Sequence, residues 1–169
     1  MEKKVYSEAE IEELAEKAAK GAMEHFKHGL TCAECVFKGF LDLGLTDFPP
    51  EVVALSSGFG GGMGGTKHTC GAINGGMLAI ATMQGRKNPY ALPTFEERVE
   101  ELHKEETGVY PRHGAYVKAC ITEWGTLDCR DLCIPYDEST PEGTKERARN
   151  CKQIIGFCAR EATKAALKP

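Results

Sequence analysis

The sequence lacks a basic cluster, a long apolar run and a recognisable export signal. Its formal net charge is −4 at pH 7 and its pI is near 5.8, so neither nucleic acid nor an anionic membrane is expected as its main partner. No window approaches the roughly 18 apolar residues that a membrane span requires. Residues 1–4 are charged, but Glu-rich sequence follows where a signal peptide would be apolar. We therefore expect a cytoplasmic protein with no membrane partner.

Several catalytic signatures are also missing. The sequence has no Gly-x-Ser-x-Gly motif, and its Gly-rich run is not followed by the Gly-Lys-Ser/Thr of a P-loop. The Cys-x-x-Cys motif at Cys32 and Cys35 continues with Val36 instead of His, so a c-type haem motif is absent. A thioredoxin-like use of that motif would need a preceding strand, and the sequence contains no convincing strand. These absences favour an all-α protein and give no indication of a hydrolase.

The apolar residues recur at helical spacing, and helix start signals accompany them. Residues 7–10 and 94–97 have the pattern of capping boxes, in which Ser or Thr is followed three residues later by Glu. We predict an all-α fold, a single compact bundle of about six helices. The length of 169 residues suits one domain, with an N-terminal helix in residues 1–30 and a Cys-rich, redox-type core in residues 31–169.

Glycine occupies six of the eight positions in residues 58–65. Ordering such a run is costly, so a domain retains it where side chains would obstruct or where φ must be positive. A flexible linker is the alternative, but linkers combine glycine with serine and charge, whereas this run carries Phe59 and Met63. We predict a loop that leads into a central helix from about Cys70 to Met83. Its candidate cofactor-binding residues are Gly60, Gly61, Gly62, Gly64 and Gly65.

Eight cysteines stand out in this composition: Cys32, Cys35, Cys70, Cys120, Cys129, Cys133, Cys151 and Cys158. In a chain of this length without an export signal, reduced thiols that serve metal or redox chemistry are expected more than disulfides. Free cysteine is also a common small residue of protein cores, and we expect about half of these eight to have that role.

Three of the thiols lie at predicted helix starts. Cys32, Cys70 and Cys129 follow Thr, Thr and Asp, which are residues that cap helices. A helix N-terminus favours negative charge, so we expect acidic thiols there. Cys151, from the last predicted helix, would be a fourth ligand. Four thiolates suit an Fe–S cluster or a tetrahedral Zn site, and the spacing alone does not choose between them.

The chain resembles the family of redox-active proteins named for a C_GCAxxG_C_C cysteine pattern, which is related to a domain of split-Soret cytochrome c. The resemblance rests on residues 31–33, 58–65, 70–76 and 125–132, and on Cys151 in the last helix. It implies a helical, cytoplasmic redox protein, with an Fe–S centre suspected in the split-Soret relatives. The implied ligands are Cys32, Cys70, Cys129 and Cys151. The central motif reads Cys-Gly-Ala instead of Gly-Cys-Ala, and Cys35 and Cys133 are possible substitute ligands.

Three functional hypotheses remain open from the sequence. The leading one is a metal centre, preferably an Fe–S cluster, for electron transfer or redox sensing. The second is metal-free thiol–disulfide chemistry at Cys32 and Cys35, or between Cys70 and Cys129. The third is a structural Zn site or a binding module for a small anion. The small residues of the central helix would also permit a homodimer, whereas no redox partner protein and no catalytic residue are identified.

Overall fold

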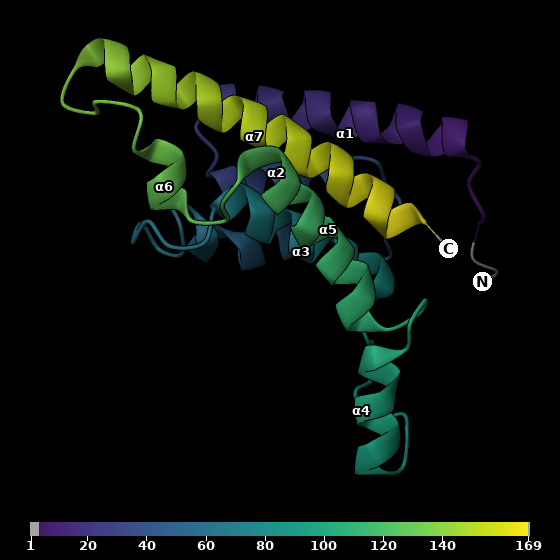
Figure 1. The fold of residues 1–169 in the computed structure, drawn as a ribbon. Coiled ribbons are helices and arrows are strands. Elements are labelled where there is room, and N and C mark those ends of the chain that lie inside the picture. Colours follow the sequence, from purple (N-terminus) through teal and green to yellow (C-terminus); the bar gives the residue numbers. More distant parts are fainter. Residues whose placement is uncertain (1–3, 169) are drawn as a thin grey trace.

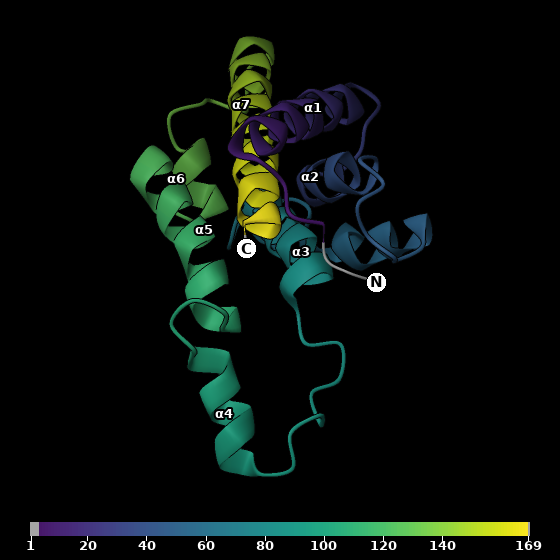
Figure 2. The same ribbon diagram turned by 90° about the vertical axis from the view of Figure 1, so that its right-hand side faces the viewer.

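The computed structural model describes residues 4–168, and this part of the chain is helical without a strand (Figure 1, Figure 2). Its elements are α1 (Glu8–Lys27), α2 (Cys32–Leu41), the 3-10 helix η1 (Pro50–Phe59), α3 (Gly71–Gln84), α4 (Phe95–His103), α5 (Val109–Trp124), α6 (Cys129–Cys133) and α7 (Pro141–Leu167). The all-α prediction is confirmed. The described residues form eight helical segments where about six were expected, and two of the eight, η1 and the five-residue α6, are short.

The longest helices, α1 and α7, lie antiparallel along one side of the molecule (Figure 1). The buried face of α1 is largely alanine, which lets the two backbones come close. Ion pairs flank this contact, with Arg160 Nε 2.6 Å from Glu16 Oε1 and Lys164 Nζ 2.8 Å from Glu12 Oε2. The inner face of α7 is apolar, and Ile154, Ile155 and other apolar residues on it are buried.

The small residues of α3 allow its neighbours to approach closely. A Cβ added to Gly75 would lie 2.5 Å from the carbonyl oxygen of Ala33 in α2. A Cβ added to Gly76 would collide with the hydroxyl of Tyr116 in α5. Because α2, α5 and α7 all pack on α3, this helix is the centre of the bundle, and its N-terminal end places Cys70 among the other helix starts.

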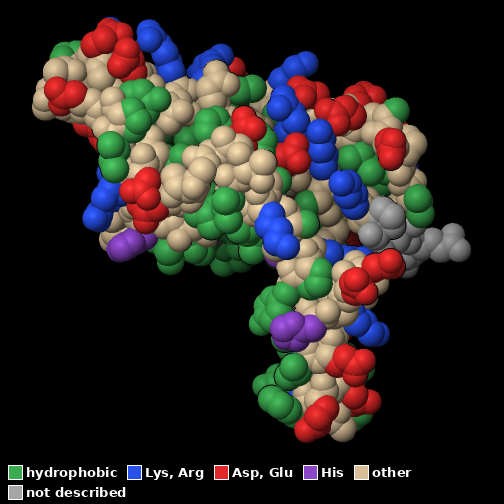
Figure 3. All heavy atoms as spheres, in the orientation of Figure 1, with side chains coloured by type: hydrophobic (Ala, Val, Ile, Leu, Met, Phe, Trp, Pro, Cys, Tyr) green, Lys and Arg blue, Asp and Glu red, His purple; other side chains and the backbone are tan. Residues whose placement is uncertain are grey.

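One helix projects away from the bundle. Both ribbon views show α4 extending from the body as an arm, and none of its residues is buried (Figure 1, Figure 2). Acidic side chains lie on this arm, whereas over α7 and α1 Lys and Arg side chains are interspersed with acidic ones (Figure 3). None of the helices in residues 4–168 combines the length and apolar character that crossing a bilayer would demand. The expected location and the single-domain organisation stay predictions.

Candidate thiol site

Five thiols surround one small cavity at the end of the bundle where α2, α3 and α6 begin. The cavity has a volume of about 30 Å³. The four predicted ligands Cys32, Cys70, Cys129 and Cys151 all line it, and Cys133 is the fifth. Cysteines distant in sequence therefore meet at one place. Whether they bind a cofactor stays a prediction.

A short backbone bridge brings the starts of α3 and α6 together. Thr69 and Asp128 form an isolated antiparallel bridge, in which the amide of Cys70 donates to the carbonyl of Leu127 at 2.8 Å. The amide of Cys129 donates to the carbonyl of His68, also at 2.8 Å. Main-chain hydrogen bonds thus hold together the helix starts that carry two thiols 59 positions apart in sequence. The periodicity of apolar residues within a helix does not predict such a pairing.

The start of α2 is anchored to the same place through Thr31. Thr31 is the N-cap, as predicted; its hydroxyl and the Glu34 carboxylate form a capping box that was not predicted, and Glu34 Oε1 also accepts a hydrogen bond from the Ser57 hydroxyl at 2.5 Å. A Cβ added to Gly71 would lie 3.4 Å from Cys32 Cβ. The first turn of α2 is therefore packed directly on the first turn of α3, and the Cys32 thiol reaches the cavity.

The predicted glycine loop covers the cavity with backbone. Residues 61–65 all have positive φ, including Met63 at 55°. This left-handed path is open to glycine at little cost. Gly61 and Gly62 line the cavity, whereas Gly60, Gly64 and Gly65 do not. A Cβ on Gly62 would lie 2.6 Å from the His68 carbonyl oxygen and 2.8 Å from Cys129 Cβ, so only glycine fits there.

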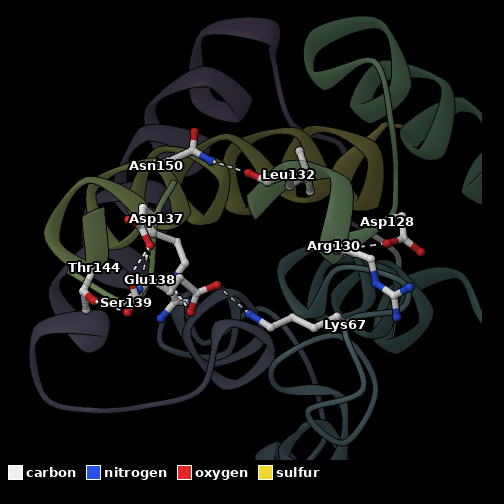
Figure 4. A network of polar contacts seen from close by, with 10 residues as sticks. Lys67, Asp128, Arg130, Leu132, Asp137, Glu138, Ser139, Thr144 and Asn150 are labelled. Carbon is white, nitrogen blue, oxygen red and sulfur yellow. Dashed lines mark hydrogen bonds and ion pairs between the residues drawn. The ribbon is translucent and has the colours of Figure 1, made fainter. Parts of the chain in front are cut away.

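Two cations lie beside the thiols, and neither was singled out from the sequence. Arg147 lines the cavity one turn before Cys151 on α7. Its Nε lies 3.2 Å from Glu138 Oε2, and Lys67 Nζ of the glycine loop lies 3.0 Å from Glu138 Oε1. Glu138 thus connects the loop to α7 (Figure 4). The spacing of Arg147 and Cys151, four residues apart in a helix, was the sequence signal that could have identified the nearer cation.

Helix α6, which forms another wall of the cavity, is attached to α7 by a side-chain amide. Asn150 Nδ2 donates to the carbonyl of Leu132 at 3.2 Å, which fixes α6 against α7 (Figure 4). Asp128 caps α6, as predicted, by accepting a hydrogen bond from the amide of Arg130 at 2.9 Å. Cys129 and Cys133 are consequently one turn apart on the face that α6 turns toward Cys151 and Cys70.

The expectation of acidic thiols at helix starts is wrong. Burial raises the pKa of Cys70 to about 11, although the amides of Ala72 and Ile73 act in the opposite direction. Burial likewise raises the pKa of Cys129 to about 12. Cys70 is itself the N-cap of α3, the position that Thr69 was expected to fill. The cost of burying a thiolate exceeds the gain from the helix dipole at these positions.

The acidic thiol of the cavity is Cys151, within a helix instead of at its start. A hydrogen bond with Cys32 lowers the pKa of Cys151 to about 7, and the charges of Arg147 and Lys67 act in the same direction. The same interaction with Cys151 raises the pKa of Cys32 above its ordinary value. Cys151 is therefore the thiol of this pair that loses its proton more readily.

The possible substitute ligands differ in position. Cys133 lines the cavity, but Cys35 does not: its Sγ donates to the Leu30 carbonyl at 3.6 Å, and burial raises its pKa to about 12. Cys35 therefore does not face Cys32 as a partner in the cavity. The remaining cysteines, Cys120 and Cys158, are fully buried in the core and were not assigned a function from the sequence.

The donor set suits a soft metal centre, but its present spacing does not enclose one. Thiolates are the ligands of Zn and of Fe–S clusters, and five of them line this cavity. Within residues 4–168, however, no three His, Cys, Asp or Glu side chains converge closely enough to hold a metal ion. A volume of about 30 Å³ accommodates an ion-sized occupant, so a larger group would require the glycine loop to move outward.

Comparison with known proteins supports the redox assignment. The sequence model of a family described as "Putative redox-active protein (C_GCAxxG_C_C)" matches residues 30–165. The matched region begins just before α2 and includes every residue that lines the thiol cavity. No curated protein and no solved structure matches the chain.

Proposed function

The chain belongs to the C_GCAxxG_C_C family of redox-active proteins, and on this premise we propose that its thiol cavity binds a Cys-ligated metal centre. An Fe–S cluster is preferred over Zn, and its use would be electron transfer or redox sensing. One observation carries the proposal: five thiols from four helices line one cavity, which the glycine loop covers with main chain. A disulfide exchange site needs two thiols, so the additional three favour a ligand shell.

The proposed ligands are Cys32, Cys70, Cys129 and Cys151, with Cys133 as a substitute for Cys129. Each comes from an element whose position is fixed by contacts outside the cavity, namely the capping box of α2, the bridge before α3 and α6, and the packing of α7 on α1. Such second contacts hold ligands in place when the ligands themselves carry charge.

The glycine loop and the cations would tune the centre. Gly61 and Gly62 place main chain, without side chains, against the sulfurs, where N–H groups can donate to a bound cluster. Arg147 and Lys67 offset part of the negative charge of the thiolates. When bound, an Fe–S cluster supplies one-electron transfer. The chain's own residues supply the thiolates, limit the access of water and set the local charge.

Anaerobic reconstitution with iron and sulfide tests this proposal. We expect a coloured protein with charge-transfer absorption, and stoichiometric iron and sulfide by elemental analysis. Cys70→Ser should lose most of the bound iron, whereas the matched variant Cys120→Ser, whose thiol is outside the cavity, should retain it. A colourless, iron-free protein after reconstitution would contradict the Fe–S proposal, and stoichiometric zinc in the protein as purified would replace it with a structural Zn site.

A second candidate function is metal-free thiol–disulfide exchange, and one observation favours it. Cys151 has a pKa lowered to about 7 by its hydrogen bond with Cys32, which would make Cys151 the attacking thiol and Cys32 its partner. This pair differs from the pairs expected from the sequence. Oxidation of metal-free protein with a small disulfide, followed by peptide mapping, should then yield a Cys32–Cys151 crosslink. The small-anion module and the homodimer stay predictions.

A further inference from the structure

One face of α5 and one face of α7 line a second cavity, which shares no residue with the thiol cavity. Its volume is about 360 Å³, within the range of small-molecule sites. Helix α5 contributes Arg112, Ala115, Tyr116 and Ala119, and α7 lines the facing wall with the same spacing, from Glu161 to its C-cap Lys168. Such spacing places all the residues of each set on a single helix face. The two helices lie side by side in Figure 2.

Small side chains leave this space open between the helices. Ala115 and Ala119 of α5 and Ala165 of α7 line the cavity with methyl groups only. Protein interiors otherwise contain few voids larger than a water molecule, because side chains interdigitate. A hollow of this size with a small apolar wall therefore suits the apolar part of a small ligand.

Hydrogen bonds to α3 fix the walls of the cavity. The buried Tyr116 donates from its hydroxyl to the Ile73 carbonyl at 3.3 Å. Gln84, the last residue of α3, donates from Nε2 to the carbonyls of Ala165 at 2.7 Å and Ala166 at 3.1 Å. Carbonyls at the end of a helix lack donors within that helix, so Gln84 satisfies groups that α7 cannot. The cavity is consequently formed before any ligand enters it.

Arg112 is a cation of this cavity that remains available to a ligand. Its neighbour Lys164 is already paired, with Nζ 2.8 Å from Glu12 Oε2 and 3.6 Å from Glu161 Oε1. Among residues 4–168, by contrast, the half-buried Arg112 has no ion-pair partner, and its Nε donates to the Glu106 carbonyl at 3.0 Å. The terminal nitrogens of a guanidinium match the two oxygens of a carboxylate. A carboxylate is therefore the anionic group expected beside Arg112.

Two carboxylates line the same end of the cavity. Glu105 and Glu106 come from the segment before α5, and neither is in an ion pair with another residue of the described chain. Because Arg112 holds the main chain of Glu106, charges of both signs lie close together. A purely anionic ligand would meet the two glutamates, and a purely cationic one would meet Arg112. A ligand that carries one ammonium and one carboxylate group matches both.

We propose that this cavity binds an amino-acid-type zwitterion, either a free apolar amino acid or a short peptide. Its carboxylate binds Arg112, its ammonium group faces Glu105 and Glu106, and its apolar part lies against the alanine wall. The site is separate from the thiol cavity and does not depend on a cofactor there.

Isothermal titration calorimetry of the full chain with the dipeptide leucyl-alanine tests the proposal. We expect saturable binding, and the N-acetylated dipeptide and the C-terminal amide should each bind about tenfold more weakly, because each lacks one charged contact. Free leucine, titrated in the same way, distinguishes a peptide site from an amino-acid site by the tighter binding of one of the two. Absence of saturable binding for both, or equal binding of the dipeptide and its two capped forms, would overturn the proposal.

Two variants locate the binding. Arg112→Gln should weaken binding of the dipeptide about tenfold and remove its advantage over the amide, whereas the control Lys118→Gln, exposed on α5 outside the cavity, should bind as the wild type does. Ala115→Leu keeps the arginine but fills the cavity from an exposed position, so it should abolish binding while the helical circular dichroism stays unchanged. Wild-type affinity in either cavity variant would overturn the assignment.

Discussion

The two thiol groups of this protein are both built on α7, seven residues apart, yet their surroundings differ. At Cys151, thiols from four helices face a small cavity beside Arg147 and Lys67, and the pKa of Cys151 falls to about 7. At Cys158, two thiols and Tyr116 are sealed between α5 and α7, and burial raises the pKa of Cys158 well above its ordinary value. At Cys151 the hydrogen bond with Cys32, together with the charges of Arg147 and Lys67, outweighs the cost of burial, although this thiol does not lie at a helix start.

The difference extends to the backbone around each group. The first group is covered by a left-handed glycine turn, whose Gly62 packs against Cys129 so closely that no side chain fits there. The second is covered by ordinary helix packing on α3 and α7. Ligand binding is therefore expected at the first group, whereas both thiols of the second group are fully buried in the core.

The largest expected effect comes from filling the space above the first group. Gly62→Ala should lower the free energy of unfolding by about 3 kcal/mol, because the new methyl group would meet the His68 backbone and Cys129 Cβ in addition to the strain of positive φ. Chemical denaturation measures this loss.

Gly64→Ala is the matched control for that substitution. Gly64 also has positive φ, at 70°, but the nearest atom to an added Cβ is the Gly58 carbonyl oxygen at 3.9 Å. The Gly64→Ala substitution should lower the free energy of unfolding by only about 1 kcal/mol, because it adds the backbone strain of positive φ without a steric clash. Equal losses in the two variants would show that the glycine loop is not packed on the thiols as described.

The second prediction concerns the cation. Arg147→Gln removes a positive charge that lowers the pKa of Cys151, so the rate of Cys151 alkylation at pH 7 in metal-free protein should fall about fivefold. Arg149→Gln, at an exposed position two residues away, is the control and should leave the rate unchanged. Rates come from timed labelling and mass spectrometry, and an unchanged rate in Arg147→Gln would show that Arg147 does not contribute to the acidity of Cys151.

The third prediction concerns the pH profile of the same labelling. The thiolate is the reactive form, so a lowered pKa means that Cys151 is reactive above about pH 7 and loses reactivity as the pH falls through that value. Cys70, with its pKa raised to about 11 by burial, should remain slow up to strongly alkaline pH. Coincident profiles for Cys151 and Cys70 would remove the distinction between them.

The smallest expected effect lies at the anchor of α2. Glu34→Ala removes the capping box and the Ser57 contact, and should cost about 1 kcal/mol of unfolding free energy at neutral pH. Glu97→Ala, in the equivalent box of the projecting α4, should cost less because no second segment depends on it.

The free energy of unfolding measured at acidic pH tests whether the Glu34 carboxylate causes this effect. The hydrogen bond from Ser57 and the amide of Thr31 hold the pKa of Glu34 below its ordinary value. Its contribution is therefore present above the unfolded pKa and lost as the pH falls through the folded pKa. The difference in stability between the wild type and Glu34→Ala should shrink in acid, and a constant difference across that range would contradict this account.

Most of the fold follows from local signals that the sequence states directly. Ser7, Thr31, Thr94 and Asp128 cap helices where their side chains predicted, and the small residues of α3 allow close packing. Helix α7 starts at Pro141, with Thr140 as its N-cap, because proline is favoured in a first turn.

The sequence by itself determined the all-α class, the glycine loop and the set of cysteines worth considering, because capping, periodicity and backbone freedom are local properties. Only the tertiary structure decided that Cys133 joins the cavity and that Cys35 does not. It also decided that Cys151, and not a thiol at a helix start, is acidic. The pKa of a thiol depends on its burial and on charges such as those of Lys67 and Arg147, which are 80 residues apart in sequence and come together only in the folded chain.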